Sequence, residues 1–320
     1  MMEHTANWHG KPYYSLDAWC KNTLQHKCYK IALNAHMTCP NRDGTKGSGG
    51  CIFCSAGGSG DFAVSTAGRS VEDQLSEGES LLMGKTTLPH EIPCIIAYFQ
   101  AYTNTYAPVE YLEQIFSQTL SSPRVCGISI ATRPDCLPNE VLALLAALKK
   151  RFTDKFIWIE LGLQTIHENT ARFIRRGYEL PCFEEAFANL QALNIPVITH
   201  VILGLPGEFR TQMLETVSYL SRLKPFGIKL QLLHVLKDTC LAACYEKGDF
   251  EVLTKEEYLD MVIDCLEHLS PDIVIHRVTG DGPRRLLMAP LWSKDKRSVL
   301  NELHRKLHER GSFQGCRMDV

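Results

Sequence analysis

Short apolar runs alternate with amphipathic segments along most of the chain. Six apolar runs predict strands at Tyr29–Leu33, Cys94–Gln100, Gly127–Ala131, Phe156–Leu161, Val197–Leu203 and Ile228–His234. Between them, periodic patterns predict helices at Val71–Met83, Pro108–Leu120, Asn139–Lys150, Glu168–Arg175, Cys182–Leu193 and Arg210–Leu223. Strand, helix and strand at this spacing imply parallel pairing through right-handed crossovers. The strands are nearly continuous apolar runs, as expected where helices cover a sheet.

Six such units predict an α/β fold, either a partial (β/α)6 barrel or an open doubly wound sheet. A closed eight-unit barrel would need more units than the pattern supplies. Another strand-like run, Asp272–Val278, follows the sixth unit. We therefore divide the chain into an N-terminal extension (1–28), the α/β domain (29–278) and a C-terminal basic extension (279–320), which holds a predicted helix from about Ser298 to Arg310. Both architectures place chemistry at the carboxyl ends of the strands.

Composition and charge narrow the class of protein. The 320 residues are 45% hydrophobic and 22% charged, with a net charge of −2, which is typical of a globular protein. This balance does not indicate binding of nucleic acid by the charge of the whole chain, and it permits a local basic patch. No stretch reaches about 18 consecutive apolar residues, and His4, His9 and Lys11 argue against a signal peptide at the start. We therefore expect a cytoplasmic protein with no membrane partner.

The 13 cysteines indicate thiols or metal ligands rather than disulfides, because their number is odd and the chain is not a small secreted scaffold. Four of them lie in apolar or helical patterns, where a free cysteine acts as a small hydrophobic residue. These four are Cys126, Cys182, Cys244 and Cys265. The spacing of Cys20, Cys28 and Cys240 gives no argument for a metal site. The informative cysteines are those in glycine-rich sequence.

One glycine-rich loop directly after the first strand carries Cys39, Cys51 and Cys54. Its glycines allow tight turns that bring distant thiols together. An iron–sulfur cluster requires thiolates, and hydrogen bonds to its sulfurs tune it. Three cysteines leave one iron open to an outside ligand, whereas structural zinc sites and electron-transfer clusters use four protein ligands. His36 would complete a Cys3His zinc site, and that alternative stays open at this point.

Polar residues also follow the second and third strands. The second strand ends in the polar and aromatic segment Tyr98–Tyr106. Its side chains would line a ligand, although a turn in which Asn104 supplies the unusual dihedral angle also explains the segment. The third strand is followed by Arg133, which is costly near a buried strand unless it is paired or binds an anion. Asp135 is its expected structural partner.

The fourth and fifth strands end in further polar groups. Glu160 lies within an apolar run, and a buried carboxylate needs a cation or several donors. Gln164 ends that strand, and Arg176 follows at a helix end, where the helix C-terminus also favours a cation. His200 lies in the fifth strand, and the Gly-Leu-Pro-Gly turn at 204–207 presents N–H groups suited to an anion. Together these ends suit a ligand with a carboxylate, hydroxyls and an adenine.

Taken as a set, several segments resemble the radical SAM superfamily, in particular the YhcC/YtqA-like branch related to the Elp3-type radical SAM domain. They are Cys39–Cys54, Tyr98–Tyr106, Thr132–Asp135, Glu160–Thr165, Arg175–Tyr178, His200–Glu208, and His276–Pro283 with Ala289–Trp292. The likeness extends over nearly the whole chain. The superfamily's usual spacing is C-x3-C-x2-C, and the spacing here, C-x11-C-x2-C, is similar to the expanded loop of the Elp3-related branch.

The resemblance implies a partial barrel of the radical SAM type and two cofactors. Cys39, Cys51 and Cys54 would hold a [4Fe–4S] cluster, whose fourth iron binds S-adenosyl-L-methionine (SAM). The implied SAM contacts are Gln100, Ala101, Thr132, Glu160, Gln164, Arg176, His200 and Leu203. Among them, Gln164 would contact the ribose and Arg176 the carboxylate. Reductive cleavage of SAM would give a 5′-deoxyadenosyl radical, with flavodoxin or ferredoxin as the electron donor.

The resemblance also points to tRNA, at the side chain on carbon 5 of a wobble uridine, from carboxymethylaminomethyl to aminomethyl. The C-terminal extension is basic and partly aromatic, which suits phosphates and bases, although exposed helices are often basic for solubility alone. Its cations are Lys294, Lys296, Arg297, Arg305, Lys306, Arg310 and Arg317. The substrate-site candidates are Tyr102, Asn104, Arg277 and Asp281. The alternatives are a radical SAM enzyme on a small metabolite or protein, and a non-enzymatic zinc or Fe–S binding or redox-sensing protein.

Overall fold

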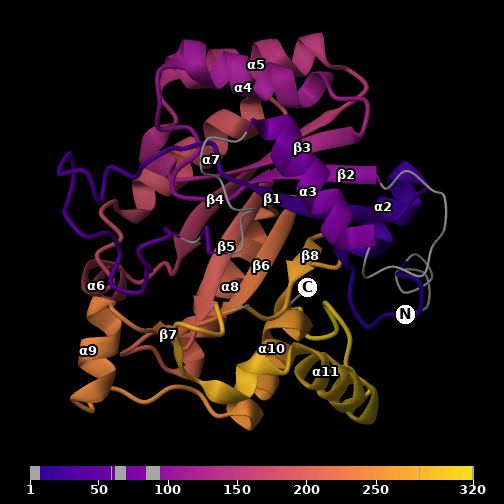
Figure 1. Cartoon of the computed structure of the whole chain (residues 1–320). Helices are drawn as coiled ribbons and strands as arrows, with labels where there is room; N and C mark the ends of the chain where they lie inside the picture. The colour runs from indigo at the N-terminus through magenta and orange to yellow at the C-terminus, as the bar shows by residue number, and fades with distance from the viewer. Residues whose placement is uncertain (1–7, 59, 62–69, 84–93, 281, 319–320) are drawn as a thin grey trace.

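The computed structural model describes residues 8–58, 60–61, 70–83, 94–280 and 282–318 (Figure 1). Within these residues, seven parallel strands form one sheet in the order β1-β2-β3-β4-β5-β6-β8. Their bounds are β1 (Cys28–Leu33), β2 (Cys94–Phe99), β3 (Val125–Thr132), β4 (Phe156–Gln164), β5 (Val197–Leu203), β6 (Gly227–Leu232) and β8 (Val274–Arg277). The spatial order follows the chain order without the reversal of a doubly wound sheet. The partial barrel is therefore confirmed, and the strand-like run after the sixth unit supplies its seventh strand.

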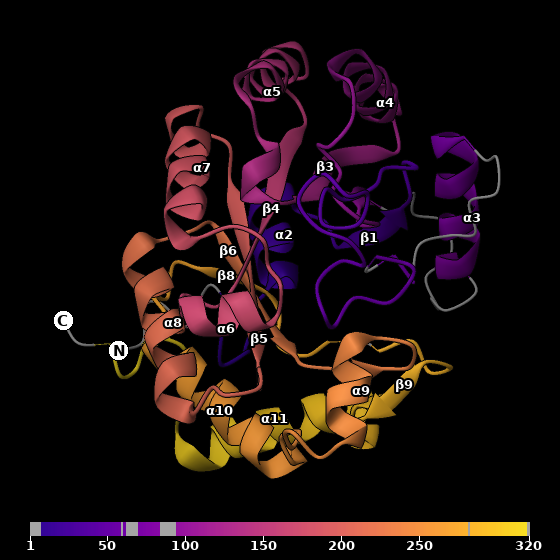
Figure 2. The same cartoon turned by 90° about the vertical axis from the view of Figure 1, so that its left-hand side faces the viewer.

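Helices form an arc around the outside of the curled sheet (Figure 2). They are α3 (Val71–Met83), α4 (Val109–Ser121), α5 (Asn139–Arg151), α7 (Leu180–Ala192), α8 (Arg210–Leu223) and α10 (Lys255–His268), whereas the short α6 (Glu168–Phe173) lies inside this arc in the view. The sheet is covered as the apolar runs predict, since every residue of β4 from 157 to 163 is buried. The predicted helix at 168–175 ends two residues early, because Arg175 (φ 54°) and Gly177 (φ 81°) turn the chain.

The N-terminal extension closes the amino end of the sheet, which the sequence pattern does not predict. Helix α2 (Leu16–Leu24) begins at Ser15, whose side chain accepts a hydrogen bond from the Ala18 N–H. Trp19 on this helix packs edge-on against Phe156, Trp158 and Phe226, with ring centroids 5.0–5.9 Å apart. Such aromatic contacts fix α2 to the amino ends of the strands.

The C-terminal part packs beside α10. Strand β6 ends at Leu232, two residues earlier than predicted, and the chain continues into β7 (Val235–Leu236), which pairs antiparallel with β9 (Leu287–Ala289). The remaining elements are α9 (Cys240–Glu246), the short 3-10 turns η1 (Pro134–Cys136) and η2 (Leu291–Lys294), and α11 (Lys296–Arg310). The predicted C-terminal helix is thus confirmed, and Asp295 caps it by accepting from the Ser298 N–H. None of the helices in the described ranges is long and apolar enough to cross a membrane.

Candidate active site

A cavity of about 260 Å³ opens at the carboxyl ends of the strands, between the cysteine loop and the β7–β9 ribbon. Most of the predicted site residues line it together: Cys39, Cys51, Cys54, Gln100, Tyr102, Thr132, Glu160, Gln164, Arg176, His200 and Arg277. Three predicted residues do not contribute to the lining. Leu203 lies in the hydrophobic core, and the side chains of Ala101 and Asn104 are buried. Asp281 lies outside the described residues.

The cysteine loop is held by its own polar side chains. Asn41, which is buried, donates from Nδ2 to the Arg175 carbonyl (2.6 Å) and contacts the Cys51 Sγ (3.6 Å). The Arg42 guanidinium donates to the carbonyls of Cys54 (3.3 Å) and Ser55. These contacts hold the three partly exposed thiols at one cavity, with the loop tied to the end of α6.

The thiols of Cys39, Cys51 and Cys54 fit an iron–sulfur cluster with one open coordination position. His36 is exposed and lines a separate depression beside α3 and α4, together with Asn34 and Gln74. It therefore does not reach the cavity that Cys39 and its two partners share, and the zinc alternative loses its fourth ligand. The three loop thiols satisfy the requirement for three thiolate ligands and leave the cavity side free for a small molecule.

A stack of two guanidinium groups around one tyrosine ring forms the part of the cavity wall next to the loop, where Lys46 of the loop pairs with Asp135 (2.9 Å). Arg133 donates from Nε and Nη2 to Asp135 (2.9 and 2.8 Å), so the predicted pairing of these two residues is confirmed. Burial alone would raise the pKa of Asp135, but Arg133 and Lys46 hold that pKa below its ordinary value. The guanidinium carbons of Arg133 and Arg176 lie 4.9 and 4.8 Å from the centre of the Tyr178 ring.

Arg176 is only 1% exposed, and its donors bind several acceptors of the chain itself. Nη1 donates to the carbonyls of Leu163 (2.9 Å) and Thr165 (2.7 Å), Nε to that of Tyr178 (2.9 Å), and Nη2 to Glu168 (3.1 Å). These bonds fix the end of β4 against the following turn. A carboxylate contact by Arg176 stays a prediction, and the observed contacts indicate at least a positioning role.

Two cavity residues adopt a left-handed backbone that is unusual for side chains of their kind. Tyr102 has φ 62° and Gln164 has φ 64°. The interpretation of Asn104 as the residue with the unusual dihedral is wrong: Asn104 is fully buried, and its Nδ2 donates to the carbonyls of Phe99 (3.1 Å) and Ala131 (3.0 Å). Strained residues of this kind persist where the surroundings hold them and often mark functional sites.

The interior of the barrel below the cysteine loop contains a charged network centred on Glu160. Its Oε1 accepts from Lys30 (2.6 Å) and Ser129 (2.7 Å), and its Oε2 accepts from His200 (2.7 Å) and Lys229. Lys229 also donates to the Tyr98 hydroxyl (3.0 Å). Residues from six of the strands, β1 to β6, therefore meet at one carboxylate.

Glu160 is ionised in this network, although it is buried. Burial alone would raise its pKa, but the ammonium groups of Lys229 and Lys30 and the bond from His200 hold that pKa well below its ordinary value. The two lysines, which pair with Glu160, are members of this network that sequence reasoning missed. The sequence could have indicated them, because each is a lysine inside an apolar strand, where a cation needs a buried partner. A direct SAM contact by Glu160 stays a prediction, since four donors of the chain surround its carboxylate.

His200 should make stability depend on pH below neutrality. Burial, followed by the charge of Lys229, lowers the pKa of His200 to about 4, against an ordinary value of 6.5. Between these values the unfolded chain binds more protons, so the free energy of unfolding should fall as pH falls. His200→Gln should remove about 3 kcal/mol of this pH-dependent loss. Urea denaturation of both proteins from about pH 7 to about pH 4 checks this, and parallel curves would contradict it.

The fold and the site define an enzyme class in which three loop cysteines at the mouth of a partial α/β barrel hold an iron–sulfur cluster with an open position. Residues 43–220 match the model of the Radical SAM superfamily, and residues 225–309 match that of the Radical_SAM C-terminal domain. The chain therefore belongs to the radical SAM superfamily. It is a radical SAM enzyme, and its cofactors are a [4Fe–4S] cluster and SAM.

Individual relatives agree with this membership. The chain is 44% identical to YtqA of Bacillus subtilis over 305 residues, which cover 95% of this chain and 92% of YtqA. It is 35% identical to YhcC of Escherichia coli K12 over 285 residues, 89% of each protein. Among solved structures, an N-terminally truncated Elp3 of the archaeon Methanocaldococcus infernus has the same fold, with a TM-score of 0.66 and 15% identity. The match covers 90% of this chain and 64% of that Elp3 chain.

Proposed function

We propose that this radical SAM enzyme modifies tRNA at the side chain on carbon 5 of a wobble uridine, from carboxymethylaminomethyl to aminomethyl. The observation that carries the proposal is the likeness to Elp3-type domains, which extends over 90% of the chain at the level of the fold. Cys39, Cys51 and Cys54 would hold the cluster, which supplies the electron for cleavage of SAM. The polar strand ends, above all Gln164, would bind and orient SAM and exclude water.

The floor of the cavity suits an anionic substrate group. Lys229, His200 and Arg277 line it together with Glu160. Burial lowers the pKa of His200 to about 4, so its imidazole is neutral near pH 7. Among the described residues of this network, Lys30 and Lys229 both contact the one carboxylate of Glu160, which leaves a positive environment for a further anion. The carboxylate of a carboxymethylaminomethyl group is an anion of suitable size.

Exposed cations beside the cavity support a nucleic-acid substrate. Lys237, Arg284 and Arg285 are exposed on the β7–β9 ribbon, where the Lys237 N–H donates to the Leu286 carbonyl (2.8 Å). Their neighbours in sequence, Leu236, Gly282 and Pro283, line the cavity wall. Cations at this rim would bind backbone phosphates while one base enters the cavity.

The C-terminal helix offers fewer cations to RNA than its sequence suggests. Several of its basic side chains pair with carboxylates of the chain: Lys306 with Asp260 (3.1 Å) and Glu256, Arg310 with Asp260, and Arg305 with Glu309 (2.6 Å). RNA binding by this tail stays a prediction. The ribbon, beside the cavity, is the surface on which we place the tRNA contact.

Nucleoside mass spectrometry tests both the substrate and the contact. In a strain that lacks the gene, the carboxymethylaminomethyl precursor should accumulate at the wobble uridine, and the wild-type gene should restore the product. A variant with Lys237, Arg284 and Arg285 changed to Gln should restore it poorly. In vitro it should bind tRNA with a salt slope reduced by about 1 for each lost phosphate contact.

The matched control removes three cations from the opposite end of the barrel. Lys150, Arg151 and Arg222 are exposed at the C-terminal ends of α5 and α8, which lie at the amino end of the strands in this architecture. Their change to Gln should leave the nucleoside profile and the salt slope as in the wild type. An unchanged wobble-uridine profile in the deletion strain would contradict a tRNA substrate and would favour a small metabolite or a protein as the substrate.

A further inference from the structure

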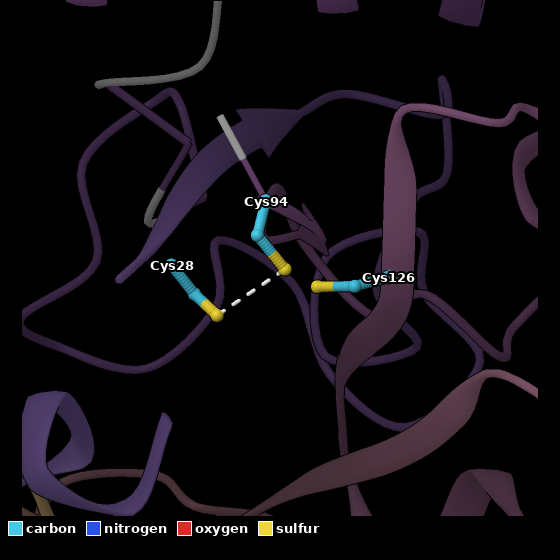
Figure 3. A group of neighbouring side chains, drawn as sticks. All are labelled: Cys28, Cys94 and Cys126. Carbon is cyan, nitrogen blue, oxygen red and sulfur yellow. Dashed lines mark hydrogen bonds between the residues drawn. The ribbon is translucent and has the colours of Figure 1, made fainter. Parts of the chain in front are cut away.

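A second group of cysteines lies at the amino end of the sheet, away from the cavity. Cys28 and Cys94 are the first residues of β1 and β2, and Cys126 is the second residue of β3. Their three Sγ atoms all lie within 4.8 Å of one another, and those of Cys28 and Cys94 are 3.3 Å apart. Figure 3 shows the three side chains pointing toward one another from neighbouring strands.

The sheet is irregular at the point where it forms this group. Cys28 and Cys94 are direct partners across β1 and β2. Between β2 and β3 the register shifts: Val125 pairs with Ile95 and Gly127 with Ile96, so Cys126 is the extra residue of a bulge. Bulges re-aim a side chain and are rare between parallel strands. Here the bulge lies at Cys126, whose thiol points toward those of Cys28 and Cys94.

A fourth cysteine from the N-terminal helix lies next to this group. Cys20 on α2 is 1% exposed and belongs to the same apolar cluster as Cys28 and Cys126. Its thiol is not one of the three Sγ atoms that lie within 4.8 Å of one another, but it packs in the same cluster as Cys28. Cysteines act as small hydrophobic residues in many cores, but apolar packing does not require sulfurs from three strands and a helix to converge.

We propose that Cys28, Cys94 and Cys126, with Cys20 as the fourth ligand, bind one zinc ion. Zinc–thiolate bonds of about 2.3 Å in a tetrahedron place the sulfurs about 3.8 Å apart, within the range that the three strand thiols occupy. This spacing is too compact for ligands of separate irons in a second cluster. Four thiolates close the coordination sphere, which is the arrangement of structural rather than catalytic zinc.

The site would fasten the N-terminal helix to the first three strands. Its ligands are far apart in the chain, and zinc would bind them only in the folded state, so binding stabilises the fold. The Trp19 cluster packs on the same helix. Zinc would therefore hold the closed amino end of the barrel, while the iron–sulfur cluster works at the other end.

Metal analysis of the anaerobically reconstituted full-length protein, supplied with zinc, tests this site. We expect one zinc per chain in addition to the irons of the [4Fe–4S] cluster, and a zinc X-ray absorption spectrum with only sulfur neighbours at about 2.3 Å. Cys94→Ser and Cys126→Ser should each lose zinc to a chelator at least ten times faster, with iron content unchanged. Cys182→Ser, a partly buried cysteine on α7, should behave as the wild type.

Three outcomes would overturn the proposal, and two of them need no variant. They are a wild-type protein without zinc, a zinc spectrum with nitrogen or oxygen neighbours, and full zinc retention by Cys94→Ser. Mass spectrometry of the protein kept under anaerobic conditions adds a further check. A Cys28–Cys94 disulfide there would identify a redox pair in place of a metal site.

Discussion

Changing Cys39, Cys51 and Cys54 together to alanine should abolish both the [4Fe–4S] absorption and the formation of 5′-deoxyadenosine from SAM. Without thiolates on this loop the cluster loses the three ligands that we predict for it, and SAM then lacks the open iron that its methionine end requires. The loss should reach the background of a reaction without protein. Anaerobic reconstitution with iron and sulfide, followed by chromatography of the products with dithionite as reductant, measures it.

Two comparisons make this result specific to the loop. Cys182→Ala removes a partly buried thiol on α7, outside the cavity lining, and should keep full cleavage activity. The triple variant itself should still bind zinc at Cys28, Cys94 and Cys126, which shows that it folds. Cleavage of SAM by the triple variant would mean that other residues hold the cluster.

Local patterns were sufficient to predict the parts of the site that depend on neighbours in sequence. The cysteine loop is one continuous segment, and its glycines and thiols are visible without a fold. The pairing of Arg133 with Asp135 spans two residues and is confirmed at 2.8–2.9 Å. The strand ends also converge as predicted, because parallel strands in chain order bring their carboxyl ends to one edge.

Contacts between distant segments could not be predicted in the same way. The pattern showed that Glu160 needs a cation, but Lys30 lies 130 positions before it and Lys229 lies 69 positions after it. Cys126 was interpreted as a small hydrophobic residue, because only a bulge in β3 brings its thiol toward those of two other strands. The positive φ angle of Tyr102 was likewise assigned to Asn104, since both residue positions lie in the same turn.

The buried network implies a large cost for removing its carboxylate. Glu160→Ala leaves Lys30 and Lys229 without their buried partner. Removing one partner of a buried ion pair typically costs about 3–5 kcal/mol of unfolding free energy. Urea unfolding of the anaerobic holoprotein measures this cost. Glu215→Ala removes a carboxylate that is 60% exposed beside His167, and it should change the unfolding free energy by less than about 0.5 kcal/mol.

A double variant separates the charge from the packing. Changing Glu160 and Lys229 together to methionine removes the carboxylate and one cation while it keeps apolar volume, so it should be less destabilising than Glu160→Ala alone. If Glu160 also positions His200 for SAM, the double variant should fold well yet bind SAM more weakly, because the imidazole loses its acceptor at 2.7 Å. A cost below about 1 kcal/mol for Glu160→Ala would contradict the network, since it would mean that water already solvates these charges.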